Sequence, residues 1–169
     1  TFFDINRCDY SANSGEPLLP RRTFLIGLPP GATVAVEITE VNVQTITDVT
    51  PLPLAQYEKN KEDRRLEVIV PDPAAYSLQQ WVPDSLAVVA GYGYARNQYV
   101  AQVRIAPVQY FPASRYVRLY TRLSIRIDID ISAMGRGKSA LQPVGSEPDW
   151  EGFYQSSILN SDMARQWRV

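Results

Sequence analysis

The chain has 169 residues and a mass of 19.0 kDa, which is enough for one domain with a hydrophobic core. Hydrophobic residues make up 45% and charged residues 21%, as in globular proteins, and this excludes a wholly disordered chain. The chain has no histidine, and Cys8 is its only cysteine, so histidine-based catalysis, histidine metal sites and an internal disulfide are excluded. A net charge of −1 gives no overall attraction to nucleic acid, and no apolar run reaches the ~20 residues that a membrane span needs. We therefore expect a binding domain without metal or cofactor, and not an enzyme.

Signals for short strands dominate the chain. Each consists of β-branched or alternating apolar residues, and most end at a cluster of proline or glycine, which cannot continue a strand or favours a turn. In chain order, the predicted strands cover residues 23–28, 33–38, 41–49, 66–70, 86–90, 98–106 and 116–131.

The strand predicted over residues 116–131 has the clearest pattern. Its odd positions from Val117 to Ile131 are apolar except for one threonine, and its even positions carry tyrosine, arginine, serine and aspartate. A period of two over sixteen residues excludes an amphipathic helix and gives one dry and one wet face, as in an antiparallel sheet. The sequence therefore predicts an all-β, antiparallel β-sandwich, jelly-roll-like, with immunoglobulin-like connections as the alternative.

The composition changes after this strand. We expect residues 1–133 to form the β-sandwich, and residues 134–152, rich in glycine, serine and proline, to form a linker. Residues 153–169 are expected to form a short amphipathic helical tail that docks on its own domain or on whatever follows. Its apolar stripe would comprise Phe153, Tyr154, Ser157, Ile158, Met163 and Trp167.

Basic residues are concentrated in one part of the chain. Residues 94–127 contain six arginines and no acidic residue, whereas residues 1–93 carry an excess of acid. One interpretation is that these arginines lie on solvent-facing strand positions and pair with the acidic first part of the chain. The alternative is a surface of stacked tyrosine and arginine side chains, which would make the protein a carbohydrate- or surface-binding β-sandwich module.

Three other motifs are weak. Residues 135–139 resemble part of a phosphate-binding loop but lack its first glycine and the following helix. Asp128 and Asp130 lie two apart on one strand face, so they are candidates to hold a hard cation, although two solvated carboxylates are the simpler interpretation. Cys8 has no histidine to activate it, and we expect a small buried side chain or a free thiol instead of a nucleophile.

Residues 57–65 are the most polar stretch and are predicted to form an exposed loop. The simpler interpretation is a solvated connection. A long basic loop is also what a trypsin-like specificity pocket accepts, because lysine and arginine reach a buried acid.

Three segments resemble the propeptides of gingipain-type cysteine peptidases. The first is Gly15-Glu16-Pro17-Leu18-Leu19-Pro20 with the later Leu28-Pro29-Pro30-Gly31-Ala32. The second is Ala106-Pro107-Val108-Gln109-Tyr110-Phe111-Pro112, followed by the long strand from Val117. The third is the tail from Phe153 to Asn160 and on to Arg165-Gln166-Trp167-Arg168, which resembles the junction to the catalytic domain.

This resemblance implies a β-sandwich pro-domain of a secreted bacterial peptidase, found outside the cell or at its surface after crossing the periplasm. Such a domain binds the cognate catalytic domain, keeps the zymogen latent and helps the enzyme to fold. In that family a loop places a lysine or arginine in the specificity pocket. The matching loop here is 54–65, and its candidate residues are Lys59, Lys61, Arg64 and Arg65. Processing would follow Arg165 or Arg168.

Overall fold

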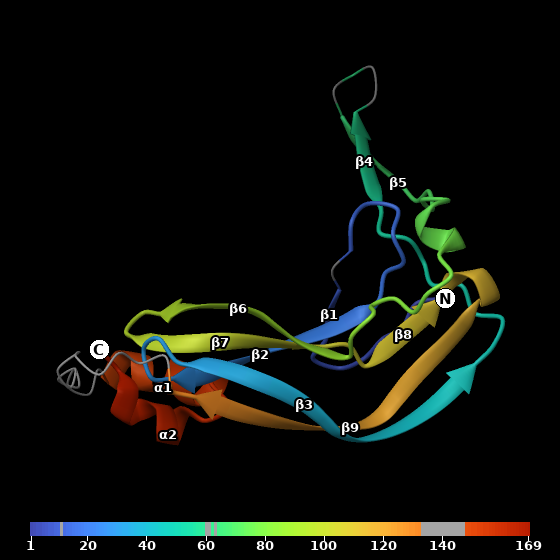
Figure 1. Ribbon diagram of the computed structural model, residues 1–169. Coiled ribbons are helices and arrows are strands. Elements are labelled where there is room, and N and C mark those ends of the chain that lie inside the picture. Colours follow the sequence, from blue (N-terminus) through green and yellow to red (C-terminus); the bar gives the residue numbers. More distant parts are fainter. Residues whose placement is uncertain (11, 60–61, 63, 133–147) are drawn as a thin grey trace. The chain divides into compact units, whose positions relative to one another are not determined.

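The chain is built mostly of strands (Figure 1). The computed structural model describes residues 1–10, 12–59, 62, 64–132 and 148–169. The strands are β1 (Asp9–Tyr10), β2 (Pro20–Leu28), β3 (Thr33–Ile46), β4 (Gln56–Lys59), β5 (Arg65–Val68), β6 (Ala87–Ala95), β7 (Gln98–Ile105), β8 (Val108–Phe111) and β9 (Tyr116–Asp130). The helices are α1 (Pro148–Ser157) and α2 (Ser161–Ala164), with 3₁₀ turns η1 (Ala75–Ser77), η2 (Pro112–Ser114) and η3 (Arg165–Trp167).

The strands form three sheets. Their orders are β1-β2-β7-β6, β3-β9-β8 and β4-β5. The pairs β1 with β2, β4 with β5, β6 with β7 and β8 with β9 are antiparallel. Antiparallel sheets that pack together, followed by short helices, confirm the predicted all-β class.

The chain divides into two compact units. The first comprises Thr1–Arg22, Glu40–Leu86 and Ala106–Leu123, and the second comprises Thr23–Thr39, Ala87–Ile105 and Ser124–Val169. Strands β2, β3 and β9 contribute residues to both units.

The core of the first unit gathers around β8 and β9. Leu19, Val108, Tyr110 and Val117 are buried, and Leu119 packs against them. Val117 and Leu119 are two apart on β9, as the period of two predicts, because alternate residues of a strand share one face.

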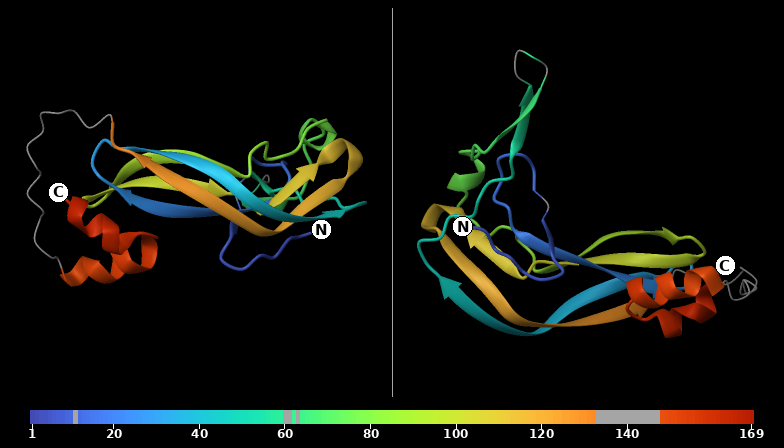
Figure 2. Two further views of the ribbon diagram at one scale, coloured as in Figure 1. Left: turned by 60° about the horizontal axis from the view of Figure 1, so that its bottom comes forward. Right: turned by 180° about the vertical axis from the view of Figure 1, so that it is seen from behind.

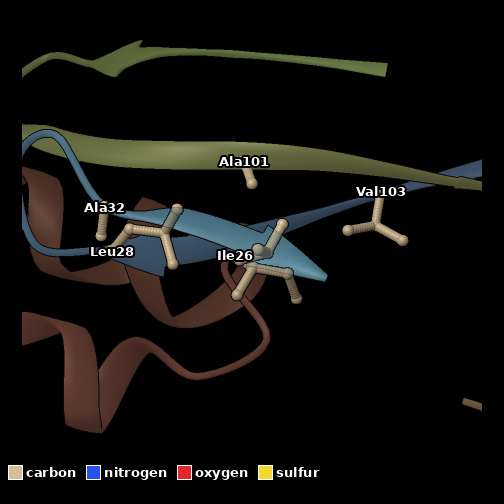
Figure 3. Close-up of a cluster of buried hydrophobic side chains, with 6 residues drawn as sticks. Ile26, Leu28, Ala32, Ala101 and Val103 are labelled. Carbon is tan, nitrogen blue, oxygen red and sulfur yellow. The ribbon is translucent and has the colours of Figure 1, made fainter. Parts of the chain in front are cut away.

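The core of the second unit lies on both faces of β7. On one face, Ala101 and Val103 pack with Ile26 and Leu28 of β2 (Figure 3). Residues of β3 and β9 join this cluster, namely Val34, Val36, Ile127 and Ile129. The participation of Ile127 and Ile129 confirms the predicted dry face at these positions, whereas the prediction is wrong at Ile131, which lies beyond the end of β9 and is exposed.

The opposite face of β7 is covered by the tail. Figure 2 shows the helices of the tail, in red, beside the strands of this unit, and Val100 packs against Tyr154 and Ile158, two of the residues of the predicted stripe. Two other residues of the predicted stripe, Phe153 and Met163, are exposed. Ala164 is buried against Gly27 of β2, because a Cβ at Gly27 would clash with the Ala164 side chain. The tail therefore docks on its own domain, one of the two predicted possibilities.

Hydrogen bonds to the backbone of β2 fix the same contact. The Gly27 N–H donates to Asn160 Oδ1 at 2.7 Å, and Asn160 Nδ2 donates to the Gly27 carbonyl at 2.9 Å. The Leu159 N–H donates to the Leu25 carbonyl at 3.0 Å.

Helix α1 begins at Pro148, inside the range 134–152 for which we predicted a linker. Residues 133–147 lie outside the described residues, and so does the motif at 135–139.

Two predicted strand ends are wrong. Residues 33–46 form one strand, β3, where we predicted two. Strand β6 continues through Gly91 and Gly93 to Ala95, although we predicted that it ends before them. Neither glycine has a positive φ, so both are extended, and the register shift between Val89 and Gly91 absorbs the irregularity.

Candidate functional site

The predicted loop contains a two-stranded hairpin formed by β4 and β5. Tyr57 pairs with Glu67, Glu58 with Leu66, and Lys59 with Arg65. The hairpin extends away from β8 and β9 of the same unit (Figure 1), and both of its faces meet solvent, with Tyr57 67% exposed. It is thus an exposed element, as predicted, but it has a regular ladder.

The basic residues lie at the far end of this hairpin. Lys59 and Arg65 are directly opposite each other, and residues that face each other across a ladder point to the same side. Both side chains are exposed, as is that of Arg64, whose Nε lies 3.5 Å from Glu62 Oε2. Lys61 lies outside the described residues. The structure therefore brings Lys59, Arg64 and Arg65 to one end of one exposed element.

The hairpin has no net charge. Residues 56–68 carry four basic and four acidic residues, so the hairpin as a whole is not attracted to a large negative surface. Like charges directly opposite each other, as Lys59 and Arg65 are, destabilise a ladder.

The base of the hairpin is held by the segment around Gly15. The Gly15 N–H donates to the Leu54 carbonyl at 2.8 Å, and the Asp72 N–H donates to the Gly15 carbonyl at 2.9 Å. Gly15 thus joins the chain just before β4 to the chain after β5. It has a φ of +83°, and a Cβ there would lie 3.1 Å from Asp72 N. This support belongs to the first motif of the family resemblance, which gave no structural role for it.

The two candidate processing residues have different environments. Arg165, in η3, is exposed, whereas Arg168 is buried at 5% exposure. Arg168 Nη1 donates to Glu151 Oε2 at 2.7 Å, and its guanidinium lies 4.0 Å from the centre of the Tyr154 ring. Sequence spacing gives no signal for this contact, because Glu151 lies in α1 and Arg168 follows η3, seventeen residues later.

Three of the six arginines of residues 94–127 pair with acidic side chains. Arg115 contacts Asp48 at 2.6 Å, Arg122 contacts Glu40 at 3.8 Å, and Arg126 contacts Glu37. All three acids lie in the first 93 residues, as the first of the two interpretations above predicts for these arginines. Two further arginines stack on tryptophan, Arg96 on Trp150 and Arg118 on Trp81.

The remaining candidates show no arrangement for chemistry. Asp128 accepts a hydrogen bond from Arg126 Nε at 3.1 Å, and Asp130 accepts one from the Ser132 N–H at 2.8 Å. Hydrogen bonding by the side chain of Ser132, and then by its backbone, lowers the pKa of Asp130. Within the described residues, no group of three or more His, Cys, Asp or Glu side chains could hold a metal ion. Partial burial raises the pKa of Cys8, so it is less reactive than an ordinary thiol.

A cavity of about 500 Å³ lies in the first unit, beside η1 and η2. Tyr76, Tyr110 and Arg115 contribute to its lining. Burial raises the pKa of Tyr76 to about 12 and that of Tyr110 in the same direction, so both hydroxyls remain protonated at neutral pH. Neither tyrosine of the cavity is therefore poised for proton transfer.

Over the described parts of the chain, no helix is long and apolar enough to cross a membrane.

The fold and the hairpin define a β-rich binding domain that presents basic side chains and has no catalytic centre among its described residues. The profile of the family described as Propeptide_C25 matches residues 3–151, and the chain belongs to this family. It is the non-catalytic propeptide segment of a gingipain-type, bacterial cysteine peptidase, which confirms the resemblance seen in the sequence. Membership of this family implies a role in zymogen latency.

Two solved structures have a similar fold. One is the complex of the pro- and mature domains of RgpB from Porphyromonas gingivalis, with a TM-score of 0.72 and 19% identity over 93% of this chain and 77% of that chain. The other concerns the zymogenic latency of gingipain K from the same organism, with a TM-score of 0.60 and 22% identity over 74% of this chain and 71% of that chain. No curated protein matches the sequence.

Proposed function

We propose that this propeptide binds the catalytic domain of its own precursor and blocks its active site with a basic side chain of the β4–β5 hairpin. The observation that carries the proposal is the pair of opposed basic residues, Lys59 and Arg65, at the exposed end of a hairpin whose base is fixed. The candidates for the side chain that enters the pocket are Lys59, Lys61, Arg64 and Arg65.

The hairpin suits this role physically. An acidic specificity pocket offers an opposite charge to a basic side chain at the end of the hairpin, where Lys59 and Arg65 lie opposite each other. The hydrogen bonds of Gly15 already order the base of the hairpin, which lowers the conformational entropy lost on binding. A rigid hairpin also resists turnover, because a scissile bond held away from the reacting geometry is cleaved slowly.

Covalent attachment strengthens the block. In our proposal residues 134–152, in which α1 begins at Pro148, lead from the β-rich domain into the docked tail, and the tail leads to the catalytic domain. Attachment of the catalytic domain to the same chain gives an effective concentration of about the millimolar range, so modest affinity is sufficient for latency. Cleavage after Arg165 or Arg168 then allows the propeptide to dissociate by dilution.

The comparisons support the partner and the location. The RgpB structure is a complex of a pro-domain with its mature domain, and we propose the same kind of partner for this chain. We further propose that the precursor is secreted, crosses the periplasm and acts outside the cell or at its surface. A propeptide that binds only the folded catalytic domain also favours its folding by mass action.

The proposal is tested by adding this chain in trans to its mature catalytic domain and measuring the hydrolysis of a small substrate with lysine or arginine before the scissile bond. We expect inhibition that competes with substrate. Alanine substitutions at Lys59, Lys61, Arg64 and Arg65, one at a time, should identify one residue whose loss weakens inhibition by about 100-fold, as for a residue that dominates an interface. Inhibition that does not compete with substrate, or that is absent at a large molar excess, would contradict the proposal.

A further inference from the structure

The last turn of the chain is fastened to the second unit through Arg168. The side chain is 6% exposed, and its ion pair with Glu151 joins the end of the chain to α1. The Val169 N–H donates to the Asn97 carbonyl at 3.0 Å, and the Tyr154 hydroxyl hydrogen-bonds to Asn97 Oδ1. Residues 168 and 169 are thus held by a side-chain contact on one side and a backbone hydrogen bond on the other.

A protease cannot bind the Arg168 side chain in its specificity pocket while that side chain is in this position. An arginine-specific enzyme binds the arginine side chain in a deep acidic pocket, so the guanidinium must first leave Glu151 and the Tyr154 ring. The backbone of Arg168 is already extended, with φ −68° and ψ 141°, as a protease requires. The preceding residues Arg165–Trp167 form the turn η3, which must open for cleavage after either arginine, so the obstacle specific to Arg168 is its buried side chain.

Arg165 presents the opposite situation. Its side chain is exposed, and its backbone lies in the single 3₁₀ turn η3. Such a turn is short and has strained hydrogen bonds, so it opens more readily than a packed helix.

We infer that Arg165 is the residue presented for processing and that the Glu151–Arg168 ion pair withholds the bond after Arg168. This inference rests on the processing step of the proposed function. The Nε and Nη2 atoms of Arg168 are buried and have no hydrogen-bond partner among the described residues, so the contact is incompletely satisfied. Loss of the ion pair then leaves the stacking on the Tyr154 ring to hold the guanidinium, so the arginine leaves its position more often.

The test uses trypsin as the probe, because it cleaves after any accessible arginine and needs no contact with the propeptide's own enzyme. The chain is extended beyond Val169 by a segment without lysine or arginine that carries a fluorescent label. Arg136 and Lys138 are replaced by glutamine in every variant, so that cuts there do not release the tail. Arg165→Gln isolates cleavage after Arg168, and Arg168→Gln isolates cleavage after Arg165.

We expect the label to be released at least about tenfold faster from the chain that keeps Arg165 than from the chain that keeps Arg168. Adding Glu151→Gln should accelerate cleavage after Arg168 by about 10- to 100-fold, the equilibrium equivalent of a charge-assisted hydrogen bond, because cleavage follows the population of the opened state. The same change should alter cleavage after Arg165 by less than about twofold.

Asp162→Asn is the matched control, because it removes one negative charge from the exposed side of the tail. Amide hydrogen exchange over α1 checks that Glu151→Gln leaves the helix docked. Equal rates at the two arginines in the parent chain would overturn the inference. So would equal acceleration at both sites by Glu151→Gln, or an equal effect of Asp162→Asn. Failure of inhibition in trans would contradict the proposed function and leave this result unaffected.

Discussion

The hairpin β4–β5 and the helical tail use the same kind of residue in opposite ways. At the end of the hairpin, Lys59 and Arg65 face each other in solvent, a pairing that costs stability. In the tail, Arg168 is buried against the Tyr154 ring and paired with Glu151. The number of basic residues in a segment therefore says little about their role, whereas the contacts of each residue distinguish an exposed charge from a structural one.

The two regions also differ in what holds them. The tail packs Tyr154 and Ile158 against Val100, so its position depends on apolar burial. The hairpin has no such core, and its ladder depends on the hydrogen bonds at its base. An isolated two-stranded ribbon is only marginally stable in water, so the hydrogen bonds of Gly15 at the base are important for keeping the hairpin rigid.

The largest expected contrast is between two tyrosines. Tyr154→Ala removes a buried ring and the surface on which Arg168 stacks, and should lower the free energy of unfolding by about 3–5 kcal/mol. Tyr57→Ala removes a ring that is 67% exposed and should change the same quantity by less than about 0.5 kcal/mol. Urea unfolding followed by tryptophan fluorescence measures both. Similar losses would contradict the contrast between the regions.

A smaller effect is expected at the base of the hairpin. Gly15→Ala places a Cβ at a φ of +83° and close to Asp72, so it should cost more than the about 1–2 kcal/mol of the backbone conformation alone. Gly31→Ala is the matched control, with a φ of +84° and open space around the Cβ. Only Gly15→Ala should also weaken inhibition in trans. If both variants inhibit equally well, the base of the hairpin does not contribute to binding.

The ion pair of the tail predicts a dependence on pH. The hydrogen bond from Arg168 holds the pKa of Glu151 below its ordinary value of 4.5. Because the pKa is depressed in the folded chain, the stabilisation is present above that ordinary value and is lost as the pH falls through the folded value. The stability difference between the parent chain and Glu151→Gln, measured by urea unfolding from about pH 7 to about pH 3, should be constant at first and then shrink. A difference that grows on acidification would refute this.

The smallest effect has opposite signs for stability and function. Lys59→Glu turns the like-charged pair with Arg65 into an opposite-charged pair and should stabilise the ladder by about 0.2–1 kcal/mol. Hydrogen exchange of the β4 and β5 amides measures this gain. Inhibition should weaken at the same time, and Lys59→Gln separates the loss of repulsion from the new attraction. A variant that loses both ladder protection and inhibition would show that Lys59 has a structural role.

Much of the fold could be predicted from the sequence, because burial on one face leaves a period of two. The pattern from Val117 to Ile131 identified β9 and its dry face, and proline-ended runs located β2 and β7. The short strands β1, β4 and β8 were missed, since two to four residues are too few to show a period. The continuation of β6 through its glycines depends on pairing with β7, which local sequence does not contain.

The candidate site was predictable in part. The polar composition of residues 57–65 located the exposed element, and the family resemblance supplied its role. The opposition of Lys59 and Arg65 depends on the register of the hairpin, and the burial of Arg168 depends on the docking of α1. Strand register and helix docking depend on contacts between segments, so the charges along the chain do not predict them.

The inhibition constant of this chain against its mature catalytic domain tests the central claim most directly. One variant replaces Lys59, Lys61, Arg64 and Arg65 by glutamine, and a matched control replaces Arg104, Arg115, Arg122 and Arg126, which removes the same charge from other parts of the chain. The account predicts that the hairpin variant binds at least about 100-fold more weakly, whereas the control changes by less than about tenfold. Equal inhibition constants for the parent chain and the hairpin variant would contradict it.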